Sequence, residues 1–308
     1  MRHLTSLLSV TSAEVVEILD LSTSLKELTA AGERRPILGG RVLTQVFEKP
    51  SLRTRASFDS AMAHLGGSSQ FFSADDAGLG GRESLEDVAR VISGYSDVLV
   101  LRTFSQRMIE QFAELASCPV VNALSDDRHP CQALTDLLTI REVFGELPGR
   151  RLVYVGDGNN VARSLAIACG KTGVSMTLAA PPGYEFDSDF LGVLDREVPG
   201  HGVTMESDPQ VAVAEADVVY TDVWASMGQE SEKSERELAF ADYQVNTALM
   251  AKAPAGCRFM HDLPARRGLE VTDEVMDGVQ SVVFRQAENR MHLAKGLLVW
   301  LLAEGQTG

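Results

Sequence analysis

Four short polar segments contain the residue types that anion binding and acyl chemistry require. They are residues 51–55 (SLRTR), 102–104 (RTF), 129–132 (HPCQ) and 261–264 (HDLP). Guanidinium groups match the geometry of oxyanions, hydroxyl groups add further donors, and histidine can exchange a proton near neutral pH. These residue types suit a site for a phosphorylated substrate.

The segment 51–55 follows an apolar stretch, 41–47, that predicts a buried strand, and a helix is predicted after it over 57–65. A helix N-terminus offers N–H donors and a partial positive charge. Ser51, Thr54, Arg53 and Arg55 would add hydroxyl and guanidinium donors there, which predicts a phosphoryl-binding site. A basic helix start on the surface is the alternative. The chain contains no GxxxxGK[ST] loop, so a nucleoside triphosphate is not the implied ligand.

The other polar segments also stand where predicted strands end. Apolar stretches at 97–101, 120–123 and 258–260 precede the segments that contain Arg102, His129 and His261. Ligands of open α/β sheets bind at the carboxyl ends of the strands. We therefore expect the polar segments to supply the site residues.

The predicted elements alternate along the whole chain. Further strands are predicted over 68–73, 152–155, 174–179 and 218–221, and further helices over 12–28 with Ser12 as cap, 84–92, 133–144, 161–171 and 287–302. This alternation predicts an α/β fold of two domains, each with a mainly parallel sheet flanked by helices. Because residues 145–151 are rich in turn formers, we expect domains over 1–146 and 147–286, with a C-terminal helix, 287–304, returning to the first.

The composition excludes several classes of protein. The 308 residues include 28 Lys and Arg against 43 Asp and Glu, a net charge of −15, which disfavours nucleic acid as a partner. The four cysteines are scattered without a CxxC pair, which fits a reducing compartment. The N-terminus lacks a long apolar segment, and no apolar run is long enough to cross a bilayer. We expect a cytoplasmic protein without a membrane partner.

Four motifs in order carry a resemblance to a known family. They are 47–55 (FEKPSLRTR), 129–138 (HPCQALTDLL), 222–228 (DVWASMG) and 286–290 (QAENR). Together they resemble the aspartate/ornithine carbamoyltransferase family, most closely its ornithine branch, over essentially the whole chain. The resemblance implies transfer of the carbamoyl group of carbamoyl phosphate to an amine in arginine biosynthesis, without a metal or cofactor, in a homotrimer or a multiple of one.

The resemblance also implies roles on the carbamoyl phosphate side. Residues that would bind carbamoyl phosphate are Ser51, Leu52, Arg53, Thr54, Arg55, Arg102, His129, Gln132, Leu263 and Arg290. Of these, Thr54, Arg102, His129 and Arg290 would face the carbamoyl oxygen, and Gln132 and the main chain of Leu263 its amide. Donors aimed at that oxygen would stabilise the oxyanion that forms when the amine attacks. Thr54, Arg102, His129 and Asp262 are the expected catalytic residues.

The acceptor side follows from the same resemblance. Asn160, Asp222, Ser226 and Met227 match the positions that hold ornithine in the family. A carboxylate such as Asp222 suits an α-ammonium group. Aspartate-specific members have an Arg-x-Gln pattern in the loop that reads WASMGQE here, and this loop has no arginine. We therefore expect L-ornithine as the acceptor and L-citrulline as the product.

Three positions depart from the family pattern. Leu52 replaces a usual Thr, and Gly78 stands where many members have a Gln that reaches a neighbouring subunit, a contact that Arg82 could supply instead. Asp262 replaces the Cys of a usual His-Cys-Leu-Pro segment near the attacking amine. An Asp there could accept a hydrogen bond from the amine, act as its base, hold it protonated, or mark another acceptor such as an N-acylated ornithine, putrescine or lysine.

Two other classes of function are weighed against carbamoyl transfer. The segment 156–161 (GDGNNV) imitates a dinucleotide-binding loop, but it lacks the third glycine, and no acidic residue follows the next predicted strand. The second alternative is a non-catalytic relative that binds carbamoyl phosphate or an amino acid. The intact Arg53, Thr54, Arg102, His129 and Arg290 oppose it, whereas Asp262 leaves it open.

Overall fold

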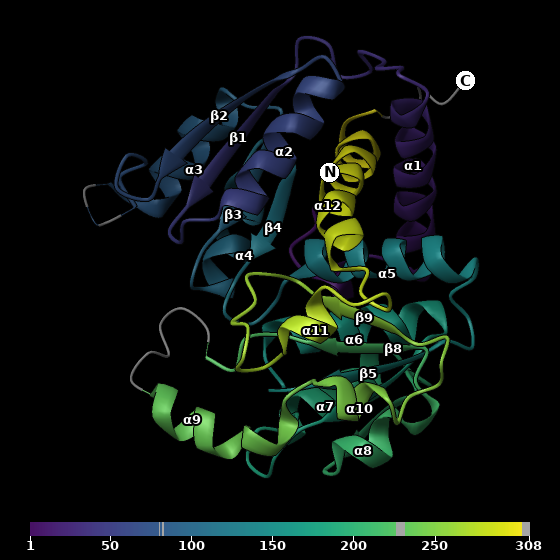
Figure 1. The fold of residues 1–308 in the computed structure, drawn as a ribbon. Coiled ribbons are helices and arrows are strands. Elements are labelled where there is room, and N and C mark those ends of the chain that lie inside the picture. Colours follow the sequence, from purple (N-terminus) through teal and green to yellow (C-terminus); the bar gives the residue numbers. More distant parts are fainter. Residues whose placement is uncertain (80, 82, 226–231, 304–308) are drawn as a thin grey trace. The chain divides into compact units, whose positions relative to one another are not determined.

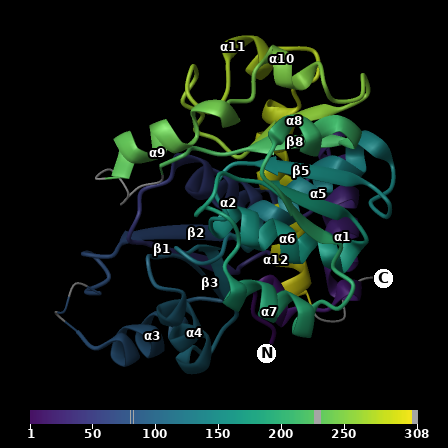
Figure 2. The ribbon, with the colours of Figure 1, turned by 90° about the horizontal axis from the view of Figure 1, so that it is seen from below.

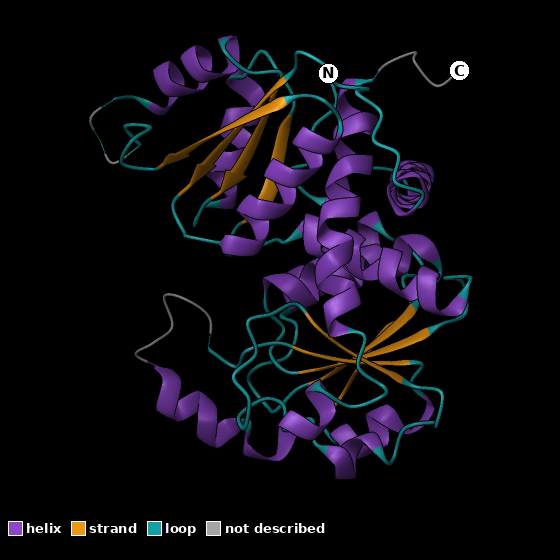
Figure 3. Ribbon diagram, turned by 45° about the horizontal axis from the view of Figure 1, so that its top comes forward, coloured by secondary structure: helices purple, strands orange, loops and turns teal. Residues whose placement is uncertain are grey.

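The computed structural model describes residues 1–79, 81, 83–225 and 232–303 (Figure 1). The chain divides into two compact units. Unit 1 comprises Met1–Leu138 and Glu288–Gly308, and unit 2 comprises Thr139–Ala287. Each unit has its own all-parallel sheet with helices around it (Figure 3). The predicted fold class, including the return of the C-terminal helix to the first unit, is confirmed.

The sheet of unit 1 has the order β2-β1-β3-β4. Its strands are β1 (Val42–Phe47), β2 (Ser68–Ser73), β3 (Val98–Arg102) and β4 (Val120–Leu124). The connections α2 (Leu52–His64), α3 (Leu85–Gly94) and α4 (Gln106–Leu115) cross the sheet, the first in one direction and the next two in the other. Right-handed crossovers in opposite directions place their helices on opposite faces. Figure 2 shows α2 on one side of the sheet and α3 and α4 on the other.

Two long helices complete unit 1. The helix α1 (Ser12–Ala30) starts at Thr11, which caps it in a reciprocal box with Glu14, so Ser12 is not the cap that the sequence suggests. The helix α12 (Val283–Leu302) begins four residues before the expected position and lies beside α1 (Figure 1). Gly296 makes this approach possible, since a Cβ there would meet Ser22 Oγ at 2.1 Å. The helix α5 (Pro130–Phe144) spans the division between the units.

The sheet of unit 2 has the order β7-β6-β5-β8-β9. The strands are β5 (Arg151–Val155), β6 (Ser175–Ala179), β7 (Val203–Glu206), β8 (Val218–Thr221) and β9 (Arg258–His261). The helices are α6 (Asn160–Thr172), α7 (Ser188–Glu197), α8 (Pro209–Ala212), α9 (Lys233–Ala239), α10 (Thr247–Met250) and α11 (Asp273–Met276). Apolar side chains of β5 and β8 pack with those of later segments, including Phe240 and Val245, into one buried cluster. None of the described helices has the length and apolar character needed to cross a membrane.

Candidate functional site

The topology of unit 1 brings the predicted phosphate-binding residues to one end of its sheet. The strand that follows β1 in sequence, β2, lies on one side of the β1–β3 pair, and the strand that follows β3, β4, lies on the other. The carboxyl ends of β1 and β3 therefore flank the point where the strand order reverses. Ligands of open α/β sheets bind at such a switch point. Ser51 follows β1, Arg102 ends β3, and His129 follows β4, the next strand.

A buried hydrogen-bonded cluster connects three of the predicted residues. Arg290 on α12 donates through Nη2 to Thr54 Oγ1 at 2.9 Å and through Nη1 to Gln132 Oε1. Gln132 Nε2 donates to Asp136 Oδ1 at 2.8 Å, which fixes the orientation of the amide. Ser51 Oγ donates to Thr54 Oγ1 at 3.0 Å. Because both acceptor positions of the Thr54 hydroxyl are occupied, this hydroxyl can still bind a ligand by donating its O–H.

His129 lies in the electrostatic field of three arginines. Burial lowers the pKa of its imidazole well below 6.5, and the charges of Arg290, Arg102 and Arg53 lower it further. The ring is therefore neutral at physiological pH and has one N–H donor. The sequence predicted a cationic site around these residues in an acidic chain, and the structure gathers Arg53, Arg102 and Arg290 around His129.

The remaining residues of the predicted phosphate segment are more exposed. Arg55 stacks on the ring of Phe71 at 4.0 Å and lies 3.7 Å from Asp59, and Leu52 is 82% exposed. The helix that they begin starts at Leu52 rather than at residue 57, because Ser51 caps it by accepting from the Thr54 N–H. The structure thus does not group Arg55 with the buried cluster, and Leu52 offers only its main chain to a ligand.

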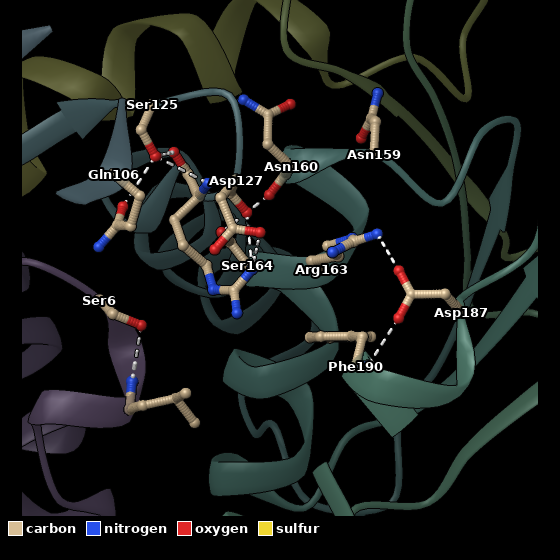
Figure 4. A network of polar contacts seen from close by, with 12 residues as sticks. Ser6, Gln106, Ser125, Asp127, Asn159, Asn160, Arg163, Ser164, Asp187 and Phe190 are labelled. Atoms are coloured by element: carbon tan, nitrogen blue, oxygen red, sulfur yellow. Dashed lines mark hydrogen bonds and ion pairs between the residues drawn. The ribbon is translucent and has the colours of Figure 1, made fainter. Parts of the chain in front are cut away.

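Two further buried cations near this end of the sheet were not predicted. Lys49 pairs with Asp126 and lies 4.3 Å from the centre of the Phe104 ring. Arg128 pairs with Asp127 at 2.7 Å, and its main-chain oxygen accepts a hydrogen bond from Ser125. Ser125 in turn donates to Gln106 at 2.8 Å (Figure 4). Lys49 belongs to the 47–55 motif, so the motif itself was the signal for this residue.

The switch point of unit 2 lies between β5 and β8. Asp222 follows β8, and Asn159, the N-cap of α6, donates to Asp222 Oδ2 at 3.1 Å. Tyr154 Oη lies 3.3 Å from Asn159 Oδ1. Burial raises the pKa of Tyr154 well above 10, so its O–H donates and orients Asn159. Asn159 was not predicted to matter, whereas the predicted Asn160 begins α6 with its Oδ1 on the Val161 N–H.

Asp222 and Asp262 follow adjacent parallel strands. Thr221 pairs with His261 in the register of β8 and β9, so the next residue of each strand is an aspartate at the same level. Atoms of Asp222, His261 and Asp262 lie within 4.8 Å of one another. Burial raises the pKa of Asp222 well above 3.8, and the neighbouring Asp262 raises it further. The predicted departure at Asp262 therefore forms a carboxyl pair with a predicted ornithine-binding residue.

His261 is held from both sides of its ring. Nε2 lies 3.3 Å from Glu270 Oε1, and Nδ1 accepts the main-chain N–H of Leu263 at 2.9 Å. Burial lowers the pKa of His261, but hydrogen bonds to Asp262 and Glu270 outweigh burial and raise it to about 9. If Nδ1 carried a proton, it could no longer accept the N–H of Leu263. It would instead donate to Asp262 Oδ1, which lies 3.5 Å away. The observed bond from Leu263 is that of the neutral ring with its proton on Nε2, facing Glu270, whereas the cationic ring favoured below about pH 9 would donate from Nδ1 to Asp262 instead.

Glu270 was missed by sequence reasoning, although it is fully buried. Its partners include the His261 ring and the main-chain N–H of Arg266. Leu263 adopts a left-handed conformation with φ of 59°, which is unfavourable for a residue with a Cβ. The His261–Leu263 hydrogen bond opposes that cost and fixes the direction of the Leu263 carbonyl.

The group Asp222, His261 and Asp262 has residue types that can bind a metal. Its hydrogen bonds argue against that use, since Nδ1 of His261 already accepts the Leu263 N–H and Nε2 faces Glu270. Asp222 also accepts from Asn159 and from the Val223 N–H. These contacts already engage both ring nitrogens of His261 and both carboxyl oxygens of Asp222.

Other predicted positions are placed as follows. Gly78 lies in a turn with φ of 75°, while Ser226, Met227 and Arg82 lie outside the described residues. Beside the start of α6, Arg163 pairs with Asp187 at 2.5 Å, and Asp187 accepts from the Phe190 N–H as the N-cap of α7 (Figure 4). This contact anchors α6 from the side, close to Asn159 and Asn160.

Comparison with known proteins agrees with this geometry. Residues 2–142 match the family model described as aspartate/ornithine carbamoyltransferase, carbamoyl-P binding domain, and residues 148–301 match the Asp/Orn binding domain. The chain is 48% identical to the ornithine carbamoyltransferase of Anoxybacillus flavithermus over 94% of this chain and 93% of the relative. It is 46% identical to the ornithine carbamoyltransferase of Bacillus subtilis over 99% of this chain and 98% of that relative.

A solved structure is similar over nearly the whole chain. The ornithine carbamoyltransferase from Pyrococcus furiosus has a TM-score of 0.94 and 44% identity, covering 98% of this chain and 97% of that one. Both domains of the family are matched, in order and over nearly the whole length. The chain belongs to the aspartate/ornithine carbamoyltransferase family.

Proposed function

We propose that this protein transfers the carbamoyl group of carbamoyl phosphate to the side-chain amine of L-ornithine, giving L-citrulline and phosphate. The observation that carries the proposal is the buried cluster of Arg290, Thr54 and Gln132 beside His129, in a chain that the family models match over nearly its whole length. The relatives with 46–48% identity are named ornithine carbamoyltransferases, which supports ornithine rather than aspartate as the acceptor.

Residues of unit 1 suit the electrophilic substrate. Thr54, Arg102, His129 and Arg290 would donate to the carbamoyl oxygen, and this donation strengthens as the oxyanion develops. Gln132 Oε1 accepts from Arg290 and retains a second lone pair for the carbamoyl amide, which the main-chain oxygen of Leu263 would also accept. Ser51, Arg53, Arg55 and the main chain of Leu52 would hold the phosphate, whose charge grows as the C–O bond breaks.

Residues of unit 2 suit the amino acid. Asp222 would accept a hydrogen bond from the α-ammonium group, and Asn160, Ser226 and Met227 would hold the α-carboxylate through amide and main-chain donors. Asn159 and Tyr154 keep Asp222 in place. These assignments follow the family pattern and the description of the matching domain as Asp/Orn binding.

We also propose the organisation in which this activity operates. Residues 1–146 with the C-terminal helix would form the carbamoyl phosphate domain, and residues 147–286 the ornithine domain. The family resemblance supports a homotrimer, or a multiple of one, that acts in arginine biosynthesis in the cytoplasm. Sedimentation equilibrium on the purified protein tests the assembly, because a monomer would contradict it.

A citrulline assay tests the activity directly. Purified protein with carbamoyl phosphate and ornithine should form citrulline and phosphate in equal amounts. Parallel reactions with aspartate, lysine, putrescine and N-acetylornithine test the acceptor. Faster carbamoylation of one of these would replace ornithine as the acceptor, and binding of carbamoyl phosphate without turnover on any of them would contradict catalysis.

A further inference from the structure

The carboxyl pair of Asp222 and Asp262 is fixed by the fold. In-register pairing of Thr221 with His261 on adjacent parallel strands sets the two aspartates at the same level. Asp222 is 7% exposed, and the side chain of Asp262 is 11% exposed. The backbone of the adjacent strands β8 and β9 thus holds two carboxyl groups together in a nearly dry environment.

Two carboxyl groups in such an environment titrate as a unit. Burial and mutual repulsion disfavour the doubly charged state, so the pair retains one proton at pH values where isolated aspartates are ionised. Asp222 carries that proton, since burial and Asp262 hold its pKa well above 3.8. The remaining charge belongs to Asp262, which is the more exposed of the two.

Behind the pair lies a second proton-binding group. His261 Nδ1 is 3.5 Å from Asp262 Oδ1, and Glu270 holds the opposite nitrogen. Tyr154 also faces the pair, but the negative charges and burial keep it protonated, so it does not titrate in the same range. Asp157 faces Tyr154 and is paired with Arg236. Among the described residues, Asp222 and His261 are therefore the titratable neighbours closest to Asp262.

We propose that Asp262, paired with Asp222 and backed by the His261–Glu270 contact, accepts the proton that the ammonium group of the acceptor must lose before it attacks. This inference rests on the proposed carbamoyl transfer. A protonated side-chain amine has no lone pair, and its ordinary pKa is about 10.4, as for lysine. A carboxylate in the position of Asp262 binds the ammonium group and then removes its proton.

The proton balance of the step is complete. The ammonium gives one proton to Asp262, and the neutral amine attacks the carbamoyl carbon to form the C–N bond. The C–O bond to phosphate breaks with its electron pair on the phosphate oxygen. The second proton on the attacking nitrogen goes to the departing phosphate, which leaves as hydrogen phosphate. Asp262 then releases the first proton to solvent.

The pH dependence of Asp262→Asn tests this role. Wild-type kcat/KM for ornithine should be nearly flat between about pH 7 and 9, because the enzyme binds the abundant ammonium form and deprotonates it. Asparagine is similar in shape to aspartate but cannot accept the proton. The Asp262→Asn variant can therefore react only with the fraction of ornithine whose side-chain amine is already neutral. Its kcat/KM should be about 10²–10⁴-fold lower at pH 7 and rise about tenfold per pH unit toward pH 10. Asp262→Ser should show the same slope.

Matched measurements make the result decisive. Asp195→Asn removes the carboxylate of an exposed His201–Asp195 pair at 3.2 Å and should reproduce the wild-type profile. Inhibition by L-2-aminopentanoate, which is ornithine without its side-chain nitrogen, should change less than about threefold in Asp262→Asn, since a proton acceptor is not needed to bind it. Profiles of Asp262→Asn and Asp262→Ser that run parallel to wild type would overturn the inference. Absence of citrulline formation by wild type at every pH would instead overturn the proposed function.

Discussion

Arg290 donates to the Thr54 hydroxyl at 2.9 Å, although 236 positions separate the two residues. Thr54 lies in the first turn of the helix that follows the first strand, and Arg290 lies on the last helix of the chain. The same guanidinium also contacts Gln132 at the start of α5. One side chain therefore connects the segments after β1 and β4 to the C-terminal helix.

Removing this guanidinium should impair catalysis strongly. We expect Arg290→Gln to lower kcat for citrulline formation by about 10²–10³-fold, the usual loss when one oxyanion donor is removed. Arg285→Gln changes an exposed arginine on the same helix and should leave kcat within about twofold. Steady-state kinetics with both substrates saturating checks this, and equal losses in the two variants would contradict the assigned role.

Replacing either of two helical glycines by alanine should change the free energy of unfolding, in opposite directions at the two positions. A Cβ at Gly296 would meet Ser22 Oγ at 2.1 Å and the Ser22 nitrogen at 2.7 Å, whereas a Cβ at Gly192 in α7 would meet nothing within 4 Å. Gly296→Ala should therefore lower the free energy of unfolding by about 1–3 kcal/mol through overpacking. Gly192→Ala should raise it by up to about 1 kcal/mol, because alanine favours the helix. Urea unfolding of both variants measures this difference in sign.

His292 should make the fold sensitive to acid. Burial lowers its pKa from 6.5 to about 4, with a further contribution from the charges of Lys295 and Lys26. Since the unfolded chain binds the proton first, this residue's contribution to stability is complete above pH 6.5 and is lost as the pH falls toward 4. In His292→Gln, the slope of unfolding free energy against pH in this window should be smaller by up to about 1.4 kcal/mol per unit. Unchanged slopes would contradict the buried neutral state.

The buried Arg236 should contribute more to stability than a comparable surface arginine. It pairs with Asp157 at 2.5 Å and donates to the Trp224 carbonyl at 3.1 Å. Arg236→Met leaves the Asp157 carboxylate without its cation and should cost about 3 kcal/mol. Arg196→Met removes an exposed pair with Glu197 at 2.8 Å and should cost less than about 1 kcal/mol. Thermal and urea unfolding of the two variants provide the comparison.

Much of the architecture could be predicted because strands and helices alternate with distinct periodicities. Every strand with a buried apolar core, such as β3 with its VLVLR segment, was predicted within two residues. The edge strand β7 was missed, since Val203–Glu206 is only half-buried and carries no apolar run. The helices α4 and α7 were also missed, although Ser105 and Asp187 cap them.

The site was less accessible to sequence reasoning than the fold. Local features placed Thr54, Arg102 and His129 at strand ends, but only the family resemblance connected them to Arg290, because no spacing rule relates residues so far apart in sequence. Glu270 had no signal, since a buried carboxylate within a turn-rich segment resembles any surface acid until its partners are known. The Asp222–Asp262 pair required the register of β8 and β9, which hydrophobic patterns do not specify.

The discontinuity of unit 1 has a consequence for biosynthesis. The segment Met1–Leu138 shares its interior with Leu293, Leu297 and Leu298 of α12, which the ribosome makes only after unit 2. The amino-terminal part of the protein consequently cannot complete its packing during translation. In the nascent chain that surface stays uncovered until α12 has been made, so unit 2, although synthesised later, can complete its packing first.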